Sequence, residues 1–475
     1  MKKIKLFTTL MCFLFIVVAG FSVFVNVSAV TISGIGTVKQ SYTRNILDNV
    51  TYTYVQSDND GSPEKNYVLE YDPAVAGVDA LAVYGTDQFG ADTITENIAL
   101  AESQGYTVIA GINASPFDTS NGTTVGVMIQ NGKLISAPNG LFGYDSFAIN
   151  DDGSMFISQS NLDMSYSVND SSYTINYFNK QKKSAENNVY LLDSDWYSDT
   201  RSNVDSCEVV LDITNGQAAI GGVLEAKVST INESTQKTAI GENQLVLIGS
   251  DLAALGNLKV GDELSFSFDD NDTANDWSKV AQSTCGFYQV LEDGNVINSS
   301  NTDVHPRTLV GYKADGTIVF YVVDGRQPGV SMGLTTRDAA LYMKSLGCTN
   351  VINLDGGGSS NMTVRLPGSD NLTTVNVPSD GEERHDADGI LLVLKDDYDT
   401  SIGDETLLHA YPNNAILLKN TVLDISVLAT DERYNTKDVP AYTMEVIGSC
   451  GSITADNKFK ARNGDGSGQV KISNG

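Results

Sequence analysis

Cysteine, histidine and tryptophan are scarce in this 475-residue chain, which contains five, three and two of them respectively. Beyond residue 29 the cysteines are widely spaced and form no Cys-x-x-Cys pair, which argues against a structural zinc site. A disulfide is chemically permitted outside the cell, but the spacing selects no pairing, and buried free thiols fit the pattern at least as well. These four cysteines are Cys207, Cys285, Cys348 and Cys450.

Basic residues are also few, with 30 lysines and arginines against 59 aspartates and glutamates and a formal net charge of -29 at pH 7. A field of this sign repels nucleic acid and anionic membranes, so we expect no nucleic-acid partner. Solubility outside the cell explains most of the charge. An anionic substrate would need a local basic pocket, which makes each arginine near a candidate site informative.

Long apolar runs are missing everywhere except at the N-terminus. There, Lys2, Lys3 and Lys5 precede an apolar stretch from Leu6 to about residue 27, and small residues follow at 27–29. This pattern predicts a signal peptide over residues 1–29 and a secreted or cell-surface protein. The apolar stretch is long for a signal peptide, so an uncleaved membrane anchor is the competing interpretation, and a membrane contact is expected only in that case.

The fold class is indicated by the composition and by the pattern of short segments. Hydrophobic residues make up 41% of the chain and aromatic residues 8%. These values are typical of a globular protein. Short strands separated by Asn-Gly and Asp-Gly turns fill residues 125–300. Capping patterns and apolar periodicity predict helices over residues 93–104 and 335–346. We therefore expect a mixed α/β (α+β) catalytic domain over residues 30–398, rich in strands and with a few helices.

A second, all-β domain is expected after a polar linker that begins beyond Lys395. Residues 404–475 contain short β patterns and are similar to bacterial immunoglobulin-like modules. A complete sandwich of this class usually needs about 100 residues, so the pattern predicts a partial, truncated immunoglobulin-like domain. Such a module could contact the cell wall.

The most unusual segment is Asp355-Gly356-Gly357-Gly358-Ser359, which follows the apolar stretch 351–354. Three glycines permit a tight turn whose consecutive N–H groups can hold an anion, and Asp355 places a carboxylate beside it. A plain flexible turn is the alternative. The segment is neither a P-loop nor a serine-hydrolase elbow, because it lacks the Gly-Lys-Ser/Thr of the first and the final glycine of the second.

A second candidate segment, Asp324-Gly325-Arg326, follows the apolar stretch 318–323. Its arginine has the planar fork that grips a pair of phosphate oxygens. Its aspartate is a candidate base or a partner for sugar hydroxyls, although a turn with an ion pair would look the same. Arg307 adds a cation near the start of a strand. We expect the two loops at the C-terminal ends of adjacent strands, a common location for a site.

Metal ligands are not indicated by the sequence. His305 and His385 are isolated, so surface or structural roles are expected for both. The acidic segment 269–272 lacks the glycine and the downstream glutamate of an EF-hand loop. The sequence therefore requires no cofactor and assigns no metal ligand, while a divalent cation remains compatible with it.

At the level of motifs, residues 306–395 closely resemble the phosphodiester glycosidases, the family that includes the lysosomal uncovering enzyme. The order and spacing of the motifs agree with the family, and a weaker likeness extends back to about residue 36. The matching motifs are Pro306-Arg307-Thr308, Val323-Asp324-Gly325-Arg326, Ser331-Met332-Gly333-Leu334-Thr335, Asn353-Leu354-Asp355-Gly356-Gly357-Gly358-Ser359 and the run from Asn376 to Arg384.

Two departures from the family concern the substrate more than the reaction. Ala114-Ser115-Pro116-Phe117 stands where the family usually has glycines and an aromatic residue, and Asp388 stands where it usually has asparagine. The resemblance implies hydrolysis of the bond between a sugar anomeric carbon and a phosphate, in a glycan or a cell-wall polymer. The substrate would thus be a glycan or sugar-phosphate.

The residues suit this chemistry, because a phosphate monoester leaves readily and a strong general acid matters less than in other glycosidases. Asp355 or Asp324 would serve as the base or as the carboxylate that stabilises the sugar cation. Two alternatives remain: a metal-dependent phosphodiesterase that attacks phosphorus, and a non-catalytic wall- or polysaccharide-binding protein. Phosphate would be held by Arg307, Arg326 or Arg384 with Gly356, Gly357, Gly358 and Ser359. Asn113, Asn353 and Asn376 would bind sugar hydroxyls or order the loops.

Overall fold

The computed structural model describes residues 21–26, 30–47, 49–75, 77–298, 300–367, 369, 371–395, 399–412, 414–417 and 419–474. Residues 1–20 and 27–29 of the expected signal peptide, including its cleavage sequence, lie outside the described residues. Among the described residues, no helix has the length and apolar character needed to cross a membrane. All four described cysteines are buried and unpaired, which is the free-thiol alternative.

Strands dominate the described chain, and its two α-helices are α1 (Ile94–Ser103) and α2 (Thr336–Ser345). Both lie where the capping patterns predict them. Thr93 and Glu96 form a complete capping box, and the Thr335 hydroxyl accepts from the Asp338 N–H. The predicted β-rich domain with few helices is therefore confirmed.

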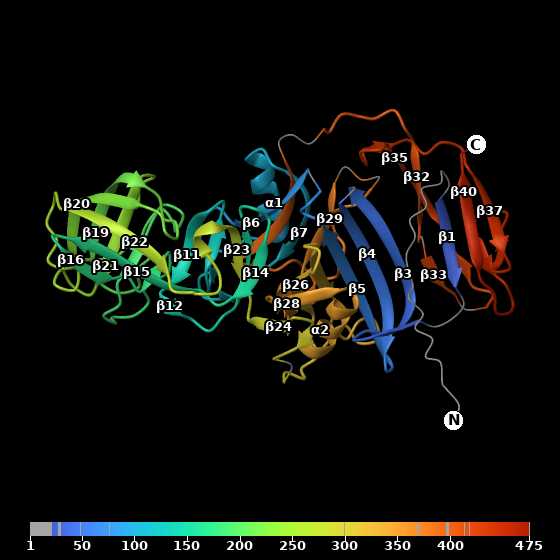
Figure 1. Cartoon of the computed structure of the whole chain (residues 1–475), viewed down its shortest axis with the longest axis horizontal. Helices are drawn as coiled ribbons and strands as arrows, with labels where there is room; N and C mark the ends of the chain where they lie inside the picture. The colour runs from blue at the N-terminus through green and yellow to red at the C-terminus, as the bar shows by residue number, and fades with distance from the viewer. Residues whose placement is uncertain are drawn as a thin grey trace, which may run out of the picture.

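The centre of the molecule is a pair of sheets packed face to face, with the tyrosine- and isoleucine-rich core between them. Helix α2 covers the outer face of the large sheet, and α1 covers the outer face of the small one (Figure 1). In spatial order, the large sheet contains β25 (Asn295–Val296), β24 (Tyr288–Glu292), β28 (Cys348–Asn353), β26 (Arg307–Lys313), β27 (Ile318–Val323), β5 (Ser62–Tyr71), β4 (Val50–Asn59) and β3 (Gly36–Leu47), with β2 (Val30–Ile32) paired to β3. The small sheet contains β30 (Leu372–Thr374), β29 (Met362–Arg365), β7 (Thr107–Asn113), β31 (Asp388–Leu394) and β6 (Val78–Tyr84).

A separate lobe, green in Figure 1, is inserted between β7 and β24 and has its own core, which includes the buried Trp277 and Phe178. The short hairpin of β8 (Phe117–Asp118) and β9 (Thr123–Thr124) precedes it, and η1 (Trp277–Lys279) lies near its end. Its sheet runs β12 (Gly140–Leu141), β15 (Asn161–Val168), β22 (Glu263–Asp270), β20 (Leu224–Thr235), β19 (Ser206–Gly216), β21 (Gln244–Gly249), β18 (Tyr190–Leu192), β17 (Tyr177–Phe178), β11 (Lys133–Pro138), β10 (Met128–Gln130), β23 (Val280–Cys285), β13 (Ser146–Asn150) and β14 (Met155–Ser158), with β16 (Ser171–Thr174) paired to β15.

The C-terminal strands form a third part, red in Figure 1, with a small apolar core around Phe459 and Cys450. An immunoglobulin-like sandwich remains a prediction for this part. The large sheet continues from β3 through β33 (Asn414–Ile416), β1 (Phe21–Asn26) and β40 (Gly468–Ser473) to β37 (Thr443–Gly448). Two small sheets hold β32 (Leu407–Tyr411), β35 (Ser426–Thr430) and β36 (Thr436–Lys437), and β34 (Val422–Leu423), β39 (Phe459–Ala461) and β38 (Gly451–Ile453).

The strand order β28-β26-β27 determines where the candidate loops meet. Strand β26 pairs antiparallel with both neighbours, so β27 and β28 run in the same direction and end at the same edge. The expectation of adjacent strands is wrong, because β26 lies between them. Since β26 runs in the opposite direction, its first residue, Arg307, reaches the edge at which β27 and β28 end.

We expect a fragment of residues 30–398 to fold and to keep any activity of the full chain. The ladder between β3 and β33 has only two residue pairs, and the Arg44 guanidinium lies 4.0 Å from the centroid of the Tyr411 ring. A cation–π contact of this kind contributes roughly 0.5–2 kcal/mol, so the melting temperature should fall by only a few degrees. Calorimetry of the fragment and the full chain tests this. Loss of both the cooperative transition and the activity would show that the C-terminal part is integral.

Candidate active site

Five segments meet at the edge where β27 and β28 end. Two come directly after these strands, one is the start of β26, one is the end of β7, and the last leads into β31. Most of the site residues expected from the sequence are therefore brought together, from positions as far apart as Asn113 and Arg384. These segments are 306–307, 324–326, 355–359, 113–115 and 376–388.

Two arginine side chains lie directly against the glycine triplet. A Cβ atom on Gly357 would be 2.9 Å from Nη2 of Arg326, and a Cβ atom on Gly358 would overlap Nη2 of Arg384. Gly357 also has a φ of 68°, a conformation that side chains disfavour. Gly357 and Gly358 therefore leave room for two guanidinium groups beside the backbone, and Gly356 leaves room for the Pro306 carbonyl.

The N–H groups of the triplet are arranged differently from the expectation. Gly356 donates to Asp355 Oδ1 (3.0 Å), Gly357 donates to the Pro306 carbonyl (3.0 Å), and Ser359 donates to the Gly356 carbonyl (3.3 Å). The expected row of consecutive free donors is not formed, because the segment closes into a short 3-10 turn, η2 (Gly357–Ser359). Positive charge at this point comes from the arginines instead.

Asp355 is half-buried and lies between the glycine turn and Arg384. Its Oδ2 accepts from the Ser359 hydroxyl (2.7 Å), which in turn accepts from Nη1 of Arg384 (3.3 Å). Burial raises the pKa of Asp355, while the hydrogen bonds from Ser359 and Gly356 and the charge of Arg384 act in the opposite direction. The side chain is thus a carboxylate beside a cation, with one face toward solvent.

Asp324 is more buried than Asp355, and both of its carboxyl oxygens accept hydrogen bonds from the protein. Its oxygens accept from the Tyr67 hydroxyl (2.9 Å) and from the Val377 N–H (2.9 Å). Asn376 Nδ2 adds a longer contact of 3.3 Å. Burial raises the pKa of Asp324, and these hydrogen bonds lower it. The carboxylate therefore fixes the 376–377 loop, whereas Arg326, two residues later, is exposed.

The asparagines serve mainly to order these loops. Asn113 donates to the Asp355 carbonyl (2.8 Å) and accepts from the Thr308 hydroxyl (2.8 Å). Asn376 donates to the Ser360 carbonyl (2.9 Å) and accepts from the Met362 N–H. Asn353 differs, because its buried Oδ1 has no hydrogen-bond partner among the described residues. These contacts favour the loop-ordering alternative for the first two residues.

Arg307 does not join the other two arginines. Its Nε donates to the Leu334 carbonyl (3.1 Å) and its Nη2 to the Asp303 carbonyl (2.6 Å), so the buried guanidinium ties the start of β26 to the loop before α2. Only its backbone lies against Gly356. Of the three candidate cations, Arg326 and Arg384 are the two at the glycine turn.

Asp386 is a residue that the sequence analysis missed. It is 1% exposed, and neither carboxyl oxygen has a hydrogen-bond partner within the described chain. Burial raises its pKa well above the ordinary value, Asp355 and Asp388 raise it further, and Ser359 and Arg384 oppose them. Burial without a hydrogen bond therefore disfavours the charged form of Asp386. The available signal was two aspartates at alternate positions before an apolar strand.

Asp388, noted only as a departure from the family, lies just beyond Asp386. Both of its oxygens accept from Ser115, one from the N–H and one from the hydroxyl, each at 2.6 Å. Burial raises the pKa of Asp388 to about 6. Lys180, from the inserted lobe, lies close enough to lower the pKa of Asp388. Burial lowers the pKa of Lys180 itself to about 7. The lobe thus contributes a charge next to the site.

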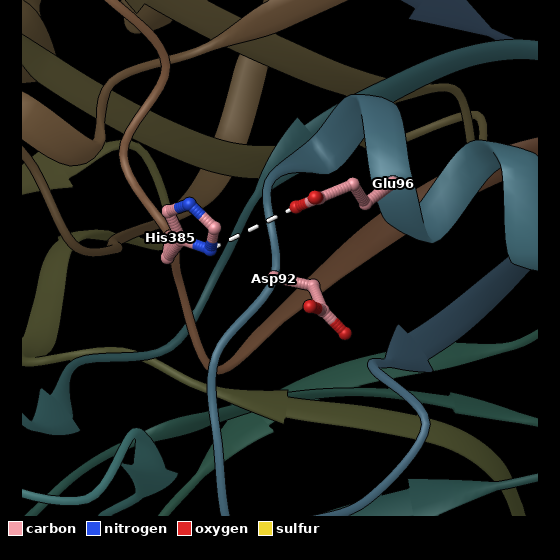
Figure 2. Close-up of side chains that lie close together, drawn as sticks. All are labelled: Asp92, Glu96 and His385. Carbon is pink, nitrogen blue, oxygen red and sulfur yellow. Dashed lines mark ion pairs between the residues drawn. The ribbon is translucent and has the colours of Figure 1, made fainter.

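Asp92, Glu96 and His385 form a group that the sequence did not indicate (Figure 2). Their ligand atoms lie within 4.8 Å of one another, and Nδ1 of His385 is 3.7 Å from Oε2 of Glu96. The same Glu96 oxygen caps α1 by accepting from the Thr93 N–H (2.8 Å) and hydroxyl (2.9 Å). The group is largely exposed, and helix capping with an added ion pair accounts for its geometry.

Glu64 is a buried carboxyl group that supports the site from β5. It accepts from the Gly333 N–H (2.8 Å) and, more weakly, from the Ser331 hydroxyl (3.4 Å). Ser331 also donates to the Asp324 carbonyl (2.8 Å), so Glu64 fixes the loop that packs against Asp324-Gly325-Arg326. Burial raises the pKa of Glu64 from 4.5 to about 8.

We expect Glu64 to make the protein less stable as the pH rises from 4.5 to 8. The folded state keeps a proton on Glu64 that the unfolded state loses above pH 4.5. The free energy of unfolding therefore falls over this pH range and becomes constant above about pH 8. The slope is at most roughly 1.4 kcal/mol per pH unit. Glu64→Gln keeps an acceptor and removes the titration. Urea unfolding of both proteins at pH 5 and pH 8 measures the effect. If the difference in unfolding free energy between the two proteins were the same at both pH values, the prediction would be wrong.

One family model and one curated protein are similar to parts of this chain. Residues 213–393 match the family model described as phosphodiester glycosidase. The SPbeta prophage-derived uncharacterized protein YomE of Bacillus subtilis (strain 168) is 40% identical over 93 residues, which are 20% of this chain and 13% of that protein. The chain therefore matches only a small part of this relative.

Two solved structures share the fold of this chain. A hypothetical protein from Synechocystis superposes with a TM-score of 0.58 at 16% identity, covering 73% of this chain and 62% of its own. A protein of Burkholderia pseudomallei K96243 gives a TM-score of 0.55 at 21% identity, covering 70% and 74%. The zebrafish N-acetylglucosamine-1-phosphodiester alpha-N-acetylglucosaminidase catalytic domain, auto-inhibited by its pro-peptide, gives a TM-score of 0.38 at 14% identity, covering 75% and 88%.

The family match extends from the inserted lobe through β31 and includes the segments that carry Asp324, Asp355 and Arg384. The activity class that this match supports is a glycosidase-type hydrolase. Residues 213–393 are thus similar to the phosphodiester glycosidase family.

Proposed function

We propose that this protein hydrolyses the glycosidic bond of a sugar-1-phosphodiester, in a glycan or a cell-wall polymer outside the cell. The observation that carries the proposal is the placement of two guanidinium groups, those of Arg326 and Arg384, against a glycine turn that also bears the half-buried carboxylate of Asp355. A phosphate diester matches the two cations, and a water molecule near Asp355 could be deprotonated by it.

The reaction needs three things, and the site offers a residue for each. Arg326 and Arg384 neutralise the departing phosphate monoester. Asp355 accepts a proton from the attacking water, whose oxygen bonds to the sugar anomeric carbon as the bond from that carbon to the phosphate oxygen breaks. The products are a sugar hemiacetal and a phosphate monoester. The negative charge of Asp355 also stabilises the positive charge that develops on the sugar.

The structure favours Asp355 over Asp324 as the base, a choice that the sequence left open. Asp324 is 1% exposed and its oxygens are taken up by Tyr67 and Val377. Asp386 strengthens the assignment, because two neighbouring carboxyl groups do not both ionise readily and the more buried one keeps the proton. Asp355 is less buried and accepts hydrogen bonds from Ser359 and Gly356, so it is the member of the pair whose charged form is better stabilised.

Export and wall contact belong to the same proposal. The sequence pattern of residues 1–29 supports export, and the C-terminal strands supply a module that could contact the cell wall. A glycan or sugar-phosphate outside the cell is the substrate class that this combination suits. No metal ion enters the proposed step.

Hydrolysis in oxygen-18 water tests the proposed bond cleavage. We expect the label in the sugar hemiacetal, because water attacks the anomeric carbon. The substrates are sugar-1-phosphodiesters, including teichoic-acid-like and glycan-phosphate compounds, and mass spectrometry of both products locates the label. Label in the phosphate would replace the proposal with attack on phosphorus, and no turnover across the panel would favour a binding protein.

Two matched substitutions separate the roles of the aspartates. Asp355→Asn should lower kcat by at least ~100-fold with little change in melting temperature, because it removes a positioned base. Asp324→Asn should lower the melting temperature instead, since an amide cannot accept from both Tyr67 and Val377 and leaves a buried donor unpaired, at a cost of roughly 1–3 kcal/mol. Steady-state kinetics and calorimetry are run on both. Near-wild-type turnover by Asp355→Asn would make Asp324 the leading candidate.

A further inference from the structure

Three aromatic side chains lie in a row beside the candidate site. The rings of Phe142 and Tyr144 are stacked, with centroids 5.6 Å apart and an angle of 24° between their planes. The centroids of Tyr144 and Phe287 are 6.2 Å apart, with an angle of 41°. Phe142 is 41% exposed, and the other two are half-buried. We call these three residues the aromatic row.

The row is held by two chain segments that are hydrogen-bonded to each other. The Asp145 carbonyl accepts from the Gly286 N–H (2.8 Å), and the Asp145 carboxylate accepts from the Gln289 N–H (2.6 Å). The loop after β12 in the inserted lobe is thereby fixed to the connection between β23 and β24. The rings thus belong to two segments that are joined by these hydrogen bonds.

The inner end of the row adjoins the site residues. The Phe287 N–H donates to the Asn353 carbonyl (2.8 Å), two residues before Asp355. On the other side, the Cys285 N–H donates to the Ser115 hydroxyl (3.0 Å), which itself donates to Asp388. The backbone of residues 285–287 therefore lies between the strand that leads to Asp355 and the residues around Asp388, and Phe287 is the member of the row that adjoins them.

We propose that Phe142, Tyr144 and Phe287 form a glycan subsite that binds the neutral sugar units next to the phosphodiester. This proposal rests on the proposed function, which places a sugar at the inner end of the row. Pyranose rings present a face of C–H groups that packs on aromatic rings, and the Tyr144 hydroxyl can also bond a sugar hydroxyl. The chain's net charge of -29 disfavours a strongly anionic polymer along this surface, so neutral sugar units fit it best.

The test uses cellotetraose, maltotetraose and chitotetraose, three neutral probes that contain no phosphate, titrated into the full chain by calorimetry. We expect the wild type to bind at least one of them, and Phe142→Ala or Tyr144→Ala to weaken that binding by roughly tenfold. Tyr144→Phe keeps the ring and should bind within about threefold of the wild type, because stacking supplies most of the contact. Leu141→Ala is the matched control, since Leu141 is an adjacent, 66% exposed apolar side chain without a ring.

Several outcomes would overturn the subsite. They are failure of the wild type to bind any of the three probes, equal binding by the alanine variants, and equal weakening by Leu141→Ala. Sedimentation showing that the alanine substitutions dissociate a wild-type dimer would identify the row as a contact between copies of the chain. Binding and turnover separate the two proposals: ring-dependent binding without hydrolysis of any phosphodiester would sustain the subsite and defeat the proposed function.

Discussion

The close approach of two guanidinium groups to a glycine backbone is the constraint on which this site depends. A Cβ atom on Gly357 or Gly358 would crowd the guanidinium group of Arg326 or Arg384, which would then have to shift. In a chain with almost twice as many acidic as basic residues, these two arginines supply the local positive charge that an anionic substrate requires. Nη2 of Arg384 is also paired with Oδ2 of Asp380 (2.6 Å). Several N–H groups of the turn bond within the protein, and Nη1 of Arg384 donates to the Ser359 hydroxyl.

The carboxyl groups around this turn differ in their exposure and in their hydrogen bonds. Asp355 has one face toward solvent, Asp388 is satisfied by Ser115, and Asp386 is enclosed without a hydrogen-bond partner in the described chain. Because burial penalises the charged form, the enclosed Asp386 holds a proton more readily than the half-buried Asp355. This is the arrangement that a base beside an anion-binding turn requires. Asp324 and Glu64, also buried, act on the loops instead.

The three parts of the molecule contribute unequally to the site. The central pair of sheets supplies the aspartates, the glycine turn and both arginines. The inserted lobe adds Lys180 near Asp388 and carries Phe142 and Tyr144 of the aromatic row. The C-terminal strands join the large sheet at β3, four strands from β26, and none of the site residues described above comes from them.

Local signals in the sequence determined the two helices and the glycine turn. Thr93 with Glu96 and Thr335 with Asp338 specify helix starts, because capping involves residues only three positions apart. The segments around Asp324 and Asp355 were identified by composition after an apolar stretch. Only the tertiary structure placed β26 between β27 and β28, brought Arg384 onto Gly358 and enclosed Asp386 near Asp355. These relations depend on strand pairing and packing between distant segments, for which a single sequence contains no local signal.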